Sequence, residues 1–385
     1  MEHSPLPEAP GAGPSHAGPP GAGRALLAGG GSGGHVFPAL AVGDELERRG
    51  WRVSYTGTAA GMEATIAASL GIDFHPLEAS AVRGRGARDR LAALWLAARS
   101  TVDARALVRR LDARVVIATG GYASVPAALG AFLRRRPVVL VEPNATPGLA
   151  NRALSRIAAA AAVAWPEAGR ALRCPARETG VPVRREFFSL ARALPPGPPW
   201  RLLVLGGSQG SATLNQVVPA ALERLRDSGV ELSVLHQAGR GKEGEPRAAY
   251  AASGVAAEVT AFLDDVPGAM AECHLVLSRA GAVTLAEICA AGRPALLLPL
   301  QLAAGHQLAN ARALERAGAA SVVEPAPRGQ GPTAEAAGAE ALAQRLGRLL
   351  QRERLCSMAE AARTLARPGA AGAIADLVEE TVAGR

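Results

Sequence analysis

The sequence predicts an α/β protein with two Rossmann-like domains, each a parallel β-sheet covered by helices on both faces. Three observations lead to this fold class. The chain has 385 residues, which is more than one ordinary hydrophobic core accommodates. Short, continuous apolar runs alternate with helical stretches, as buried parallel strands do. A strand-like run also feeds a glycine-rich turn that opens a helix at two places, residues 29–35 and 206–211.

The apolar runs form two sets of four predicted strands. A proline-rich break at residues 194–200 separates the sets. We therefore expect an N-terminal domain over residues 25–190 and a C-terminal domain over residues 200–365. Residues 1–24 are expected to be disordered, and residues 366–385 to form a helix that can pack back on the N-terminal domain. The predicted strands are Ala25–Ala28, Arg52–Tyr55, Val115–Thr119, Val138–Val141, Arg201–Leu205, Glu231–Leu235, His274–Ser278 and Ala295–Pro299.

The composition excludes several kinds of chemistry. Lys242 is the only lysine and Glu243 follows it, so the chain has no Walker A loop, and a lysine Schiff base is disfavoured. The histidines lack HExxH spacing and no Asp-x-Asp sequence is present, so we expect no metal and no cofactor. The cysteines form no CxxC pair, which indicates a reducing compartment without a disulfide framework.

Neither a signal peptide nor a transmembrane span is predicted. Residues 1–24 lack an apolar core region. Residues 115–133 are free of charge, but they contain Gly120, Gly121 and Pro126, which favour a strand, a turn and a helix. The formal net charge of +8 fits either a basic surface or a bias in genome composition, and no nucleic-acid partner is expected.

The first glycine-rich turn formally matches a dinucleotide-binding fingerprint, Gly29-x-Gly31-x-x-Gly34. That fingerprint also needs an acidic residue at the end of the second strand to hold a ribose. Here the second strand ends in residues 54–57, Ser-Tyr-Thr-Gly, which argues against NAD. The turn is either a purely structural one or a loop that lets a ligand approach the backbone closely, with His35 at the start of the helix.

Three polar segments follow predicted strands in the second half. Residues 206–210 can hold a pyrophosphate at a helix N-terminus, with the Ser208 hydroxyl adding a hydrogen bond. Residues 278–287 end in Glu287, which can hold the two hydroxyls of a ribose or can simply be a solvated acid. Residues 299–311 contain His306 and Gln307, which suit sugar hydroxyls, although an ordinary polar loop would look the same.

Taken together, five motifs resemble the MurG family of glycosyltransferases, in glycosyltransferase family 28, over about residues 25 to 325. They are Gly-Gly-x-Gly-Gly-His-Val-Phe-Pro (30–38), Gly-Gly-Tyr-x-Ser-x-Pro (120–126), Gly-Gly-Ser-Gln-Gly (206–210), Gly-Ala-x-Thr-x-x-Glu (281–287) and His-Gln-x-x-Asn-Ala (306–311). The resemblance implies a GT-B fold, with the two domains facing across a cleft. It also implies an inverting, metal-independent transfer of GlcNAc from UDP-GlcNAc to the MurNAc 4-hydroxyl of undecaprenyl-linked lipid I, giving lipid II.

The resemblance also implies a set of UDP-GlcNAc-binding residues. In order, they are Ser32, Gly33, Gly34, Asn144, Arg184, Ser208, Leu263, Ala282, Val283, Thr284, Leu285, Ala286, Glu287, His306 and Gln307. His35 is either the general base or a phosphate ligand, and Glu142 is a second candidate base. This chain departs from the family pattern at Val141 and Pro143, where histidine and glutamine are usual, and at Gly305, where many relatives carry a charged residue.

A lipid acceptor implies contact with a membrane. Arginines and apolar residues alternate in residues 83–110, and we expect Arg83, Arg85, Leu91, Leu94 and Trp95 to meet anionic lipids. The alternative is a solvated helix face in an arginine-rich chain. The implied location is peripheral, at the cytoplasmic face of the bacterial inner membrane, with cell-wall synthesis and division proteins as possible partners. Competing functions are another glycosyltransferase, a UDP-GlcNAc epimerase, a nucleotide-sugar-binding regulator and a dehydrogenase.

Overall fold

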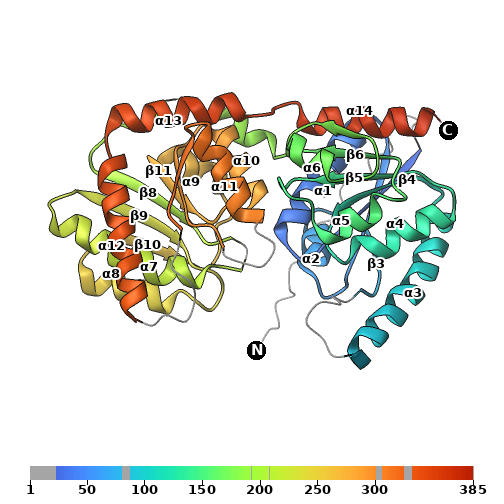
Figure 1. Cartoon of the computed structure of the whole chain (residues 1–385), viewed down its shortest axis with the longest axis horizontal. Helices are drawn as coiled ribbons and strands as arrows, with labels where there is room; N and C mark the ends of the chain where they lie inside the picture. The colour runs from blue at the N-terminus through green and yellow to red at the C-terminus, as the bar shows by residue number, and fades with distance from the viewer. Residues whose placement is uncertain are drawn as a thin grey trace, which may run out of the picture.

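The computed structural model describes residues 23–79, 87–191, 193–207, 209–300, 306–324 and 332–384. Within them the chain forms two parallel β-sheets, one in each half of the molecule (Figure 1). The predicted fold class, two Rossmann-like parallel-sheet domains, is confirmed. Residues 1–22, most of the segment expected to be disordered, lie outside the described residues.

The N-terminal sheet has the described strands in the order β3-β2-β1-β4-β5-β6-β7, and its neighbouring strands pair in parallel. Its strands are β1 (Arg24–Gly29), β2 (Arg52–Gly57), β3 (Asp73–Pro76), β4 (Ala113–Gly120), β5 (Val138–Glu142), β6 (Ala160–Val163) and β7 (Ala176–Glu178). Its helices are α1 (Gly33–Arg48), α2 (Met62–Ser69), α3 (Ala87–Arg110), α4 (Ser124–Leu133), α5 (Leu149–Leu154) and α6 (Pro166–Arg170). Because β1 and β4 are neighbours, the loops that follow them meet at one edge of the sheet.

Alternating residues of this sheet face two hydrophobic cores. Leu26 and Val116 pack with residues of α3 and α4 on one face. Leu27 and Ile117 pack on the other face with residues of α1 and of α14 (Ala370–Ala383). Successive side chains of a strand point to opposite faces, so a strand buried on both faces must be apolar throughout. This is why the predicted strands are continuous apolar runs.

The C-terminal sheet has the described strands in the order β10-β9-β8-β11-β12-β13, again in parallel. A 3-10 helix, η1 (Arg185–Ser189), precedes it. Its strands are β8 (Trp200–Leu205), β9 (Leu232–Gln237), β10 (Ala256–Thr260), β11 (Leu275–Ser278), β12 (Ala295–Leu297) and β13 (Ala320–Val322). Its helices are α7 (Ala212–Asp227), α8 (Gly244–Ser253), α9 (Val266–Glu272), α10 (Ala282–Ala291), α11 (His306–Arg316), α12 (Pro332–Leu349) and α13 (Arg352–Leu365).

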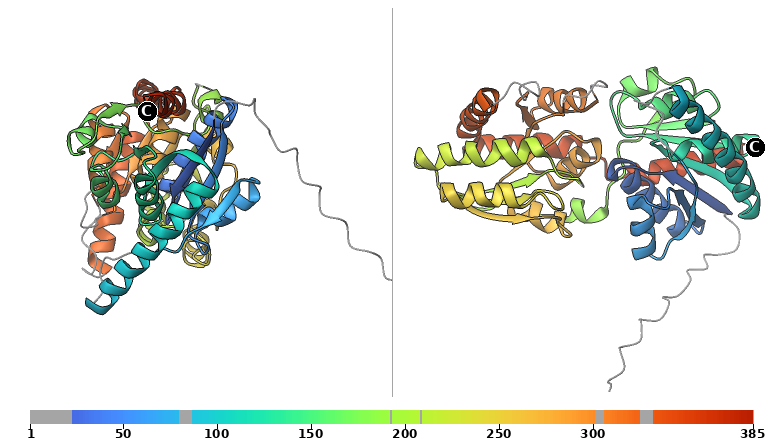
Figure 2. Two further views of the ribbon diagram at one scale, coloured as in Figure 1. Left: turned by 90° about the vertical axis from the view of Figure 1, so that its right-hand side faces the viewer. Right: turned by 90° about the horizontal axis from the view of Figure 1, so that it is seen from below.

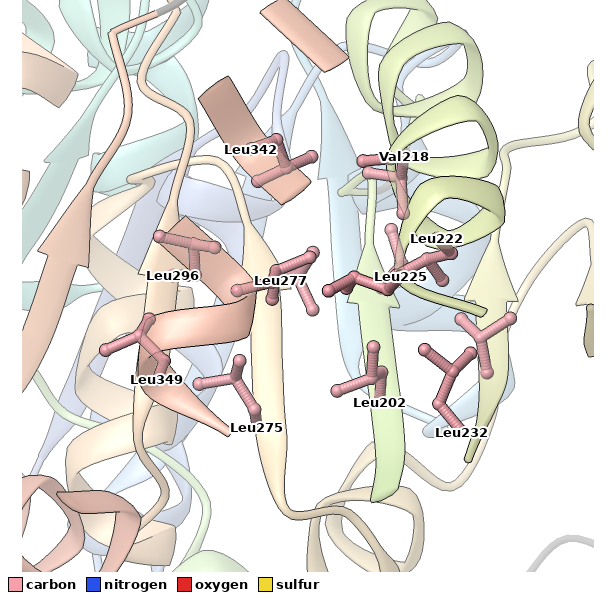
Figure 3. Packing of buried hydrophobic residues seen from close by; sticks show 14 of the residues in the cluster. Leu202, Val218, Leu222, Leu225, Leu232, Leu275, Leu277, Leu296, Leu342 and Leu349 are labelled. Atoms are coloured by element: carbon pink, nitrogen blue, oxygen red, sulfur yellow. The ribbon is translucent and has the colours of Figure 1, made fainter. Parts of the chain in front are cut away.

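The core on one face of this sheet is built largely of leucine. Leu202, Leu277 and Leu296 project from three adjacent strands toward Leu222 of α7 and Leu342 of α12 (Figure 3). The other face packs against α9, α10 and α11. Both sheets therefore have helices on both faces, and only the loops at the strand ends remain open to ligands.

Helix α14 returns from the C-terminal half to the N-terminal sheet, where the C-terminus lies (Figures 1 and 2). Its apolar residues Ile374 and Val378 are fully buried there. Arg49, which follows the last residue of α1, donates to Glu379 at 2.9 Å, and the Trp51 indole donates to the same carboxylate at 3.1 Å. The last helix is thus part of the N-terminal core.

The charge-free stretch from residue 115 to residue 133 forms most of β4 followed by α4, which confirms the predicted strand, turn and helix. Among the described residues, no helix is both long and apolar enough to cross a membrane.

Candidate active site

The polar motifs gather where the carboxyl ends of the two sheets face each other. In the N-terminal half they follow β1, β4 and β5, and in the C-terminal half they follow β8, β11 and β12. The Asn310 amide of α11 crosses between the halves. It accepts a hydrogen bond from Ala145 N at 3.0 Å and donates to Asn144 Oδ1 at 3.3 Å. Helices α1 and α10 are also in contact. The helices that carry His35 and Glu287 therefore meet where the two halves are in contact.

His35 lies in the first turn of α1, and Thr119 holds both its backbone and its side chain. The Thr119 hydroxyl donates to the His35 carbonyl at 2.7 Å, and the Thr119 carbonyl lies 2.8 Å from Nδ1 of the imidazole. A carbonyl only accepts, so the geometry assigns the proton to Nδ1 and leaves the lone pair on Nε2. Burial lowers the pKa of His35, opposed by the Thr119 carbonyl, Glu142 and Glu63. The ring is therefore neutral near pH 7 and can accept a proton.

The two glycines that follow β4 are required by the His35 ring and the first glycine-rich loop. Gly120 and Gly121 have φ values of +99° and +75°, a region that side chains rarely adopt. A Cβ on Gly120 would lie 3.0 Å from Cε1 of His35, and one on Gly121 would lie 2.5 Å from the carbonyl oxygen of Gly30. The β4 loop can approach the β1 loop closely only because both positions lack a side chain.

Glu142 ends β5 as a buried carboxylate with both oxygens engaged. Oε1 accepts from the backbone N–H and the side-chain amide of Asn144 at 3.0 and 2.9 Å. Oε2 accepts from Gly148 N at 2.9 Å and from the Asn151 amide at 3.0 Å. These four donors make Glu142 the organiser of the loop from residue 143 to residue 148, which carries Asn144 toward Asn310.

The second glycine-rich turn precedes α7 and rests on the loop that follows β9. Ser208 lies outside the described residues. Beside it, Gln237 donates to the carbonyls of Gly207 and Ala261 at 3.1 and 3.2 Å. The Lys242 ammonium donates to the Gln209 carbonyl at 2.7 Å. The only lysine of the chain therefore ties down the backbone of this turn.

The predicted binding residues of α10 divide by exposure. The side chains of Ala282, Val283 and Leu285 are buried in the protein. The backbone N–H groups of Ala282 and Val283 begin the helix and can face a ligand, whereas Leu285 N donates to the Gly281 carbonyl at 3.0 Å. Thr284, Ala286 and Glu287 are half-buried. Removal from water raises the pKa of Glu287 to about 7, while the nearby Arg184 guanidinium lowers it. Glu287 is therefore a carboxyl group that titrates near neutral pH.

The remaining predicted residues lie in loops and at helix starts. His306 begins α11, and its Nδ1 has no hydrogen-bond partner among the described residues. Gln307 accepts from Leu300 N at 2.8 Å. Arg184 precedes η1 and stacks on Phe187 at 5.2 Å. Leu263 is half-buried between β10 and α9. The half-buried residues Ser32, Gly33 and Gly34 start α1, and the Ser32 side chain makes no capping bond.

The residues expected at a membrane are only partly described. Two of them, Arg83 and Arg85, lie outside the described residues, while Leu91 and Leu94 are part of α3. Gly305, where the chain departs from the family pattern, also lies outside the described residues. The Trp95 side chain on the same helix is 64% exposed, with the Arg99 guanidinium 5.8 Å from its ring centre. Within the described ranges, no three His, Cys, Asp or Glu side chains are grouped to hold a metal ion.

The sequence analysis did not single out several polar residues that shape this site. Asn310 joins the halves, Gln237 joins the loops that follow β8 and β10, and Asn151 holds Glu142. Glu63 of α2 is 1% exposed and accepts from Gly31 N in the first glycine-rich loop at 3.3 Å. Asn310 belongs to the fifth motif, so its presence there was an available signal. The other three are recognisable only by their partners in space.

Comparison with known proteins assigns both halves to one family. Residues 25–163 match the glycosyltransferase family 28 N-terminal domain, and residues 201–332 match the glycosyltransferase family 28 C-terminal domain. A protein of Sorangium cellulosum, named UDP-N-acetylglucosamine--N-acetylmuramyl-(pentapeptide) pyrophosphoryl-undecaprenol N-acetylglucosamine transferase, is 44% identical over 92% of this chain and 87% of its own length.

Two further proteins also match along nearly the whole of this chain. A protein of the same name from Solibacter usitatus is 40% identical over 92% of this chain and 95% of its own length. The crystal structure of Acinetobacter baumannii MurG superposes with a TM-score of 0.74 at 32% identity, covering 93% of this chain and 99% of that one.

Proposed function

The chain belongs to glycosyltransferase family 28, and on this premise we propose that it transfers GlcNAc from UDP-GlcNAc to the MurNAc 4-hydroxyl of undecaprenyl-pyrophosphoryl-MurNAc-pentapeptide. The product is lipid II, and the enzyme is a hexosyltransferase. Relatives that bear this activity in their names match more than nine-tenths of the chain at 40 to 44% identity. The contact of Asn310 with Asn144 and Ala145 supports the proposal, because it holds the loop that follows β5 against α11 of the other domain.

The chemistry divides between the two domains. The acceptor hydroxyl must lose a proton as it attacks the anomeric carbon from the face opposite UDP. His35 is the base, since Nδ1 is committed to the Thr119 carbonyl and Nε2 can take the proton. Glu142, the second candidate, already accepts four hydrogen bonds. Its role is therefore to position Asn144 and the loop that meets the donor domain.

The departing UDP is stabilised by helix N-termini. The 16-residue α7 and the 10-residue α10 both begin at the carboxyl edge of the C-terminal sheet. Backbone N–H groups at such ends favour a pyrophosphate. A Cβ built on Gly281, at the start of α10, would meet no atom of the described residues within 4 Å, which fits a backbone that a ligand can approach. Glu287 holds the ribose, the backbone at Leu263 meets the uracil, and His306 and Gln307 contact the GlcNAc.

The lipid acceptor places the enzyme at a membrane surface. On α3 and α4, the described side chains of Trp95, Val102, Phe132 and Leu133 are all exposed. Arg99, Arg105 and Arg109 are exposed on the same α3 helix. Apolar side chains beside arginines suit the interface of an anionic bilayer. We propose peripheral binding at the cytoplasmic face of the inner membrane, where cell-wall synthesis and division proteins would be neighbours.

Turnover of radiolabelled UDP-GlcNAc with a short-chain lipid I analogue tests the proposal. The expected product is a lipid-linked disaccharide with an inverted, β-configured linkage, together with UDP. Formation of an epimerised UDP-sugar would indicate an epimerase, and label on diacylglycerol would indicate another glycosyltransferase. Tight UDP-GlcNAc binding without any transfer would indicate a regulator. Each of these three results contradicts the proposal.

A further inference from the structure

Glu63 is a buried carboxylate that belongs to neither the donor site nor the proposed acid–base step. It is the second residue of α2 and only 1% exposed. Its side chain lies between the loop that follows β2 and the first glycine-rich loop. A carboxylate is rarely buried so completely unless donors satisfy it, so its partners indicate what it does.

The partners of Glu63 come from both loops. Oε1 accepts from the backbone N–H of Thr58 at 2.9 Å and from its hydroxyl at 2.7 Å. Oε2 accepts from Gly31 N at 3.3 Å. An ionised carboxylate is acceptor-only, and hydrogen bonds to a charged group are the strong ones. Three donors on one carboxylate therefore suit the ionised form.

Three glycines make the space for this side chain. A Cβ on Gly30 would lie 2.2 Å from Oε1, one on Gly61 would lie 2.3 Å from it, and one on Gly57 would lie 2.5 Å from Cγ. Gly31, the donor to Oε2, has a φ of +82°, which only glycine adopts without strain. Part of the glycine-rich pattern therefore accommodates an internal carboxylate rather than a substrate.

We infer that Glu63 is a positioning residue for the transfer. Its carboxylate binds the Gly31 N–H in the first half of the glycine-rich loop and thereby fixes the second half, which leads into His35. The Gly31 N–H is committed to Glu63 and the His35 N–H to the Ser32 carbonyl, so the backbone donors at the start of α1 that remain for an acceptor diphosphate are those of Gly33 and Gly34. The Ser32 carbonyl, next to Gly31, accepts from His35 N at 3.0 Å. A displacement of Gly31 would thus move Ser32, and through the hydrogen bond to the Ser32 carbonyl it would move His35 and its imidazole. This inference rests on the proposed function of His35.

The carboxylate also acts on His35 through its charge. The groups that face the imidazole are the Thr119 carbonyl, Glu142 and Glu63, and all three raise the pKa of His35 against the effect of burial. The ring of Tyr122, in the loop that follows β4, lies beside Gly31. Removing the Glu63 charge therefore lowers the pKa of His35. A role confined to its hydrogen bonds, with no effect of its charge, would leave that titration unchanged.

The test compares Glu63→Gln with two other variants. Thr58→Val removes one hydrogen bond to Glu63 and keeps its charge. Asp73→Asn is the matched control, because it removes a carboxylate of the same domain that pairs with Arg24 and Ser54 instead. We would measure the His35 imidazole titration by NMR in the absence of substrate, and then kcat, the KM for UDP-GlcNAc and the pH–rate profile.

For Glu63→Gln we expect kcat to fall by about tenfold to a hundredfold, since small misplacements of a catalytic group have effects of this size. The KM for UDP-GlcNAc should stay within about twofold, because helices α7 and α10, which are proposed to hold UDP, are in the other domain. The His35 titration and the acidic limb should both move to lower pH. Thr58→Val should lower kcat without moving the titration, and Asp73→Asn should change neither.

An unchanged kcat and an unchanged His35 titration in Glu63→Gln would overturn the inference, as would an equal shift in Asp73→Asn. If Glu63→Gln does not fold, a normal kcat in folded Thr58→Val would overturn it. The NMR titration needs no turnover, which separates the two hypotheses. A shifted titration in Glu63→Gln beside a fully active His35→Ala enzyme would contradict the base role of His35 and leave its coupling to Glu63 standing.

Discussion

The binding of UDP should depend on pH through Glu287. The pKa of this carboxyl is raised to about 7 by its removal from water. If the ribose hydroxyls of UDP bind only ionised Glu287, the affinity for UDP is proportional to the ionised fraction of this carboxyl. That fraction is about 90% at pH 8 and about 10% at pH 6. The dissociation constant should therefore rise about tenfold between pH 8 and pH 6, equivalent to about 1.4 kcal/mol. Calorimetric titration with UDP at both values measures this directly.

The Glu287→Gln enzyme is the matched control for that titration. UDP carries a phosphate that also titrates near pH 6, and this contribution persists in the variant while the contribution of Glu287 disappears. We expect the extra pH dependence of the wild-type enzyme to vanish in Glu287→Gln. Equal pH dependence in both enzymes would refute the ribose role, as would unchanged UDP affinity in Glu287→Ala, which should lose about 1.5–3 kcal/mol at pH 8.

The same carboxyl makes a prediction for stability with a definite sign. Its folded-state pKa lies above the unfolded value, so the folded protein disfavours the ionised form. The resulting destabilisation is absent below about pH 4.5, complete above about pH 7, and at most about 3.5 kcal/mol. Without ligand, Glu287→Gln should therefore raise the free energy of unfolding in urea at pH 8 but not at pH 4. A loss of stability at pH 8 would contradict the burial argument.

Three further predictions concern metal, the domain contact and the membrane. Transfer should survive excess EDTA, and complete loss restored by magnesium or manganese would contradict the proposed mechanism. Asn310→Ala should lower the free energy of unfolding by about 1–3 kcal/mol, because Ala145 N and the Ala280 carbonyl both lose a partner. Asn144→Ala leaves that pair intact and should cost less; the reverse order in urea unfolding would contradict this reading of the contact. Trp95→Glu should weaken binding to phosphatidylglycerol vesicles by at least about tenfold. Unchanged sedimentation with vesicles would show that this face of α3 does not bind the membrane.

The sequence predicts the central strands well because their signal is strong. All eight predicted strands are present, with shifts at some ends, such as β9 at Leu232–Gln237 where Glu231–Leu235 was predicted. The strands that sequence reasoning missed carry weak patterns. The edge strand β7 is exposed along its whole length, and β10 is mostly exposed, so neither needs an apolar run. The buried β6 is three alanines and a valine, a composition that helices share.

The site was predictable where glycine marks a loop and unpredictable where distant residues meet. The turns at residues 29–35 and 206–211 were recognisable because a strand, glycines and a helix follow each other directly. Glu63 and Gly31 are 32 positions apart, and Asn310 and Asn144 are 166 apart. No local pattern reports such pairs. In the same way, the structure gives Glu142 four hydrogen-bond donors, which its position after a strand could not reveal.

The central claim is that His35 removes the proton from the acceptor hydroxyl, and the pH–rate profile of His35→Ala tests it most directly. A general base contributes about 10²–10⁴-fold to a rate and affects binding little. We predict near-normal UDP-GlcNAc affinity, a kcat lower by at least about 100-fold, and loss of the acidic limb that reports the imidazole. A decrease in kcat of less than about tenfold, or an acidic limb that persists unchanged, would contradict the claim.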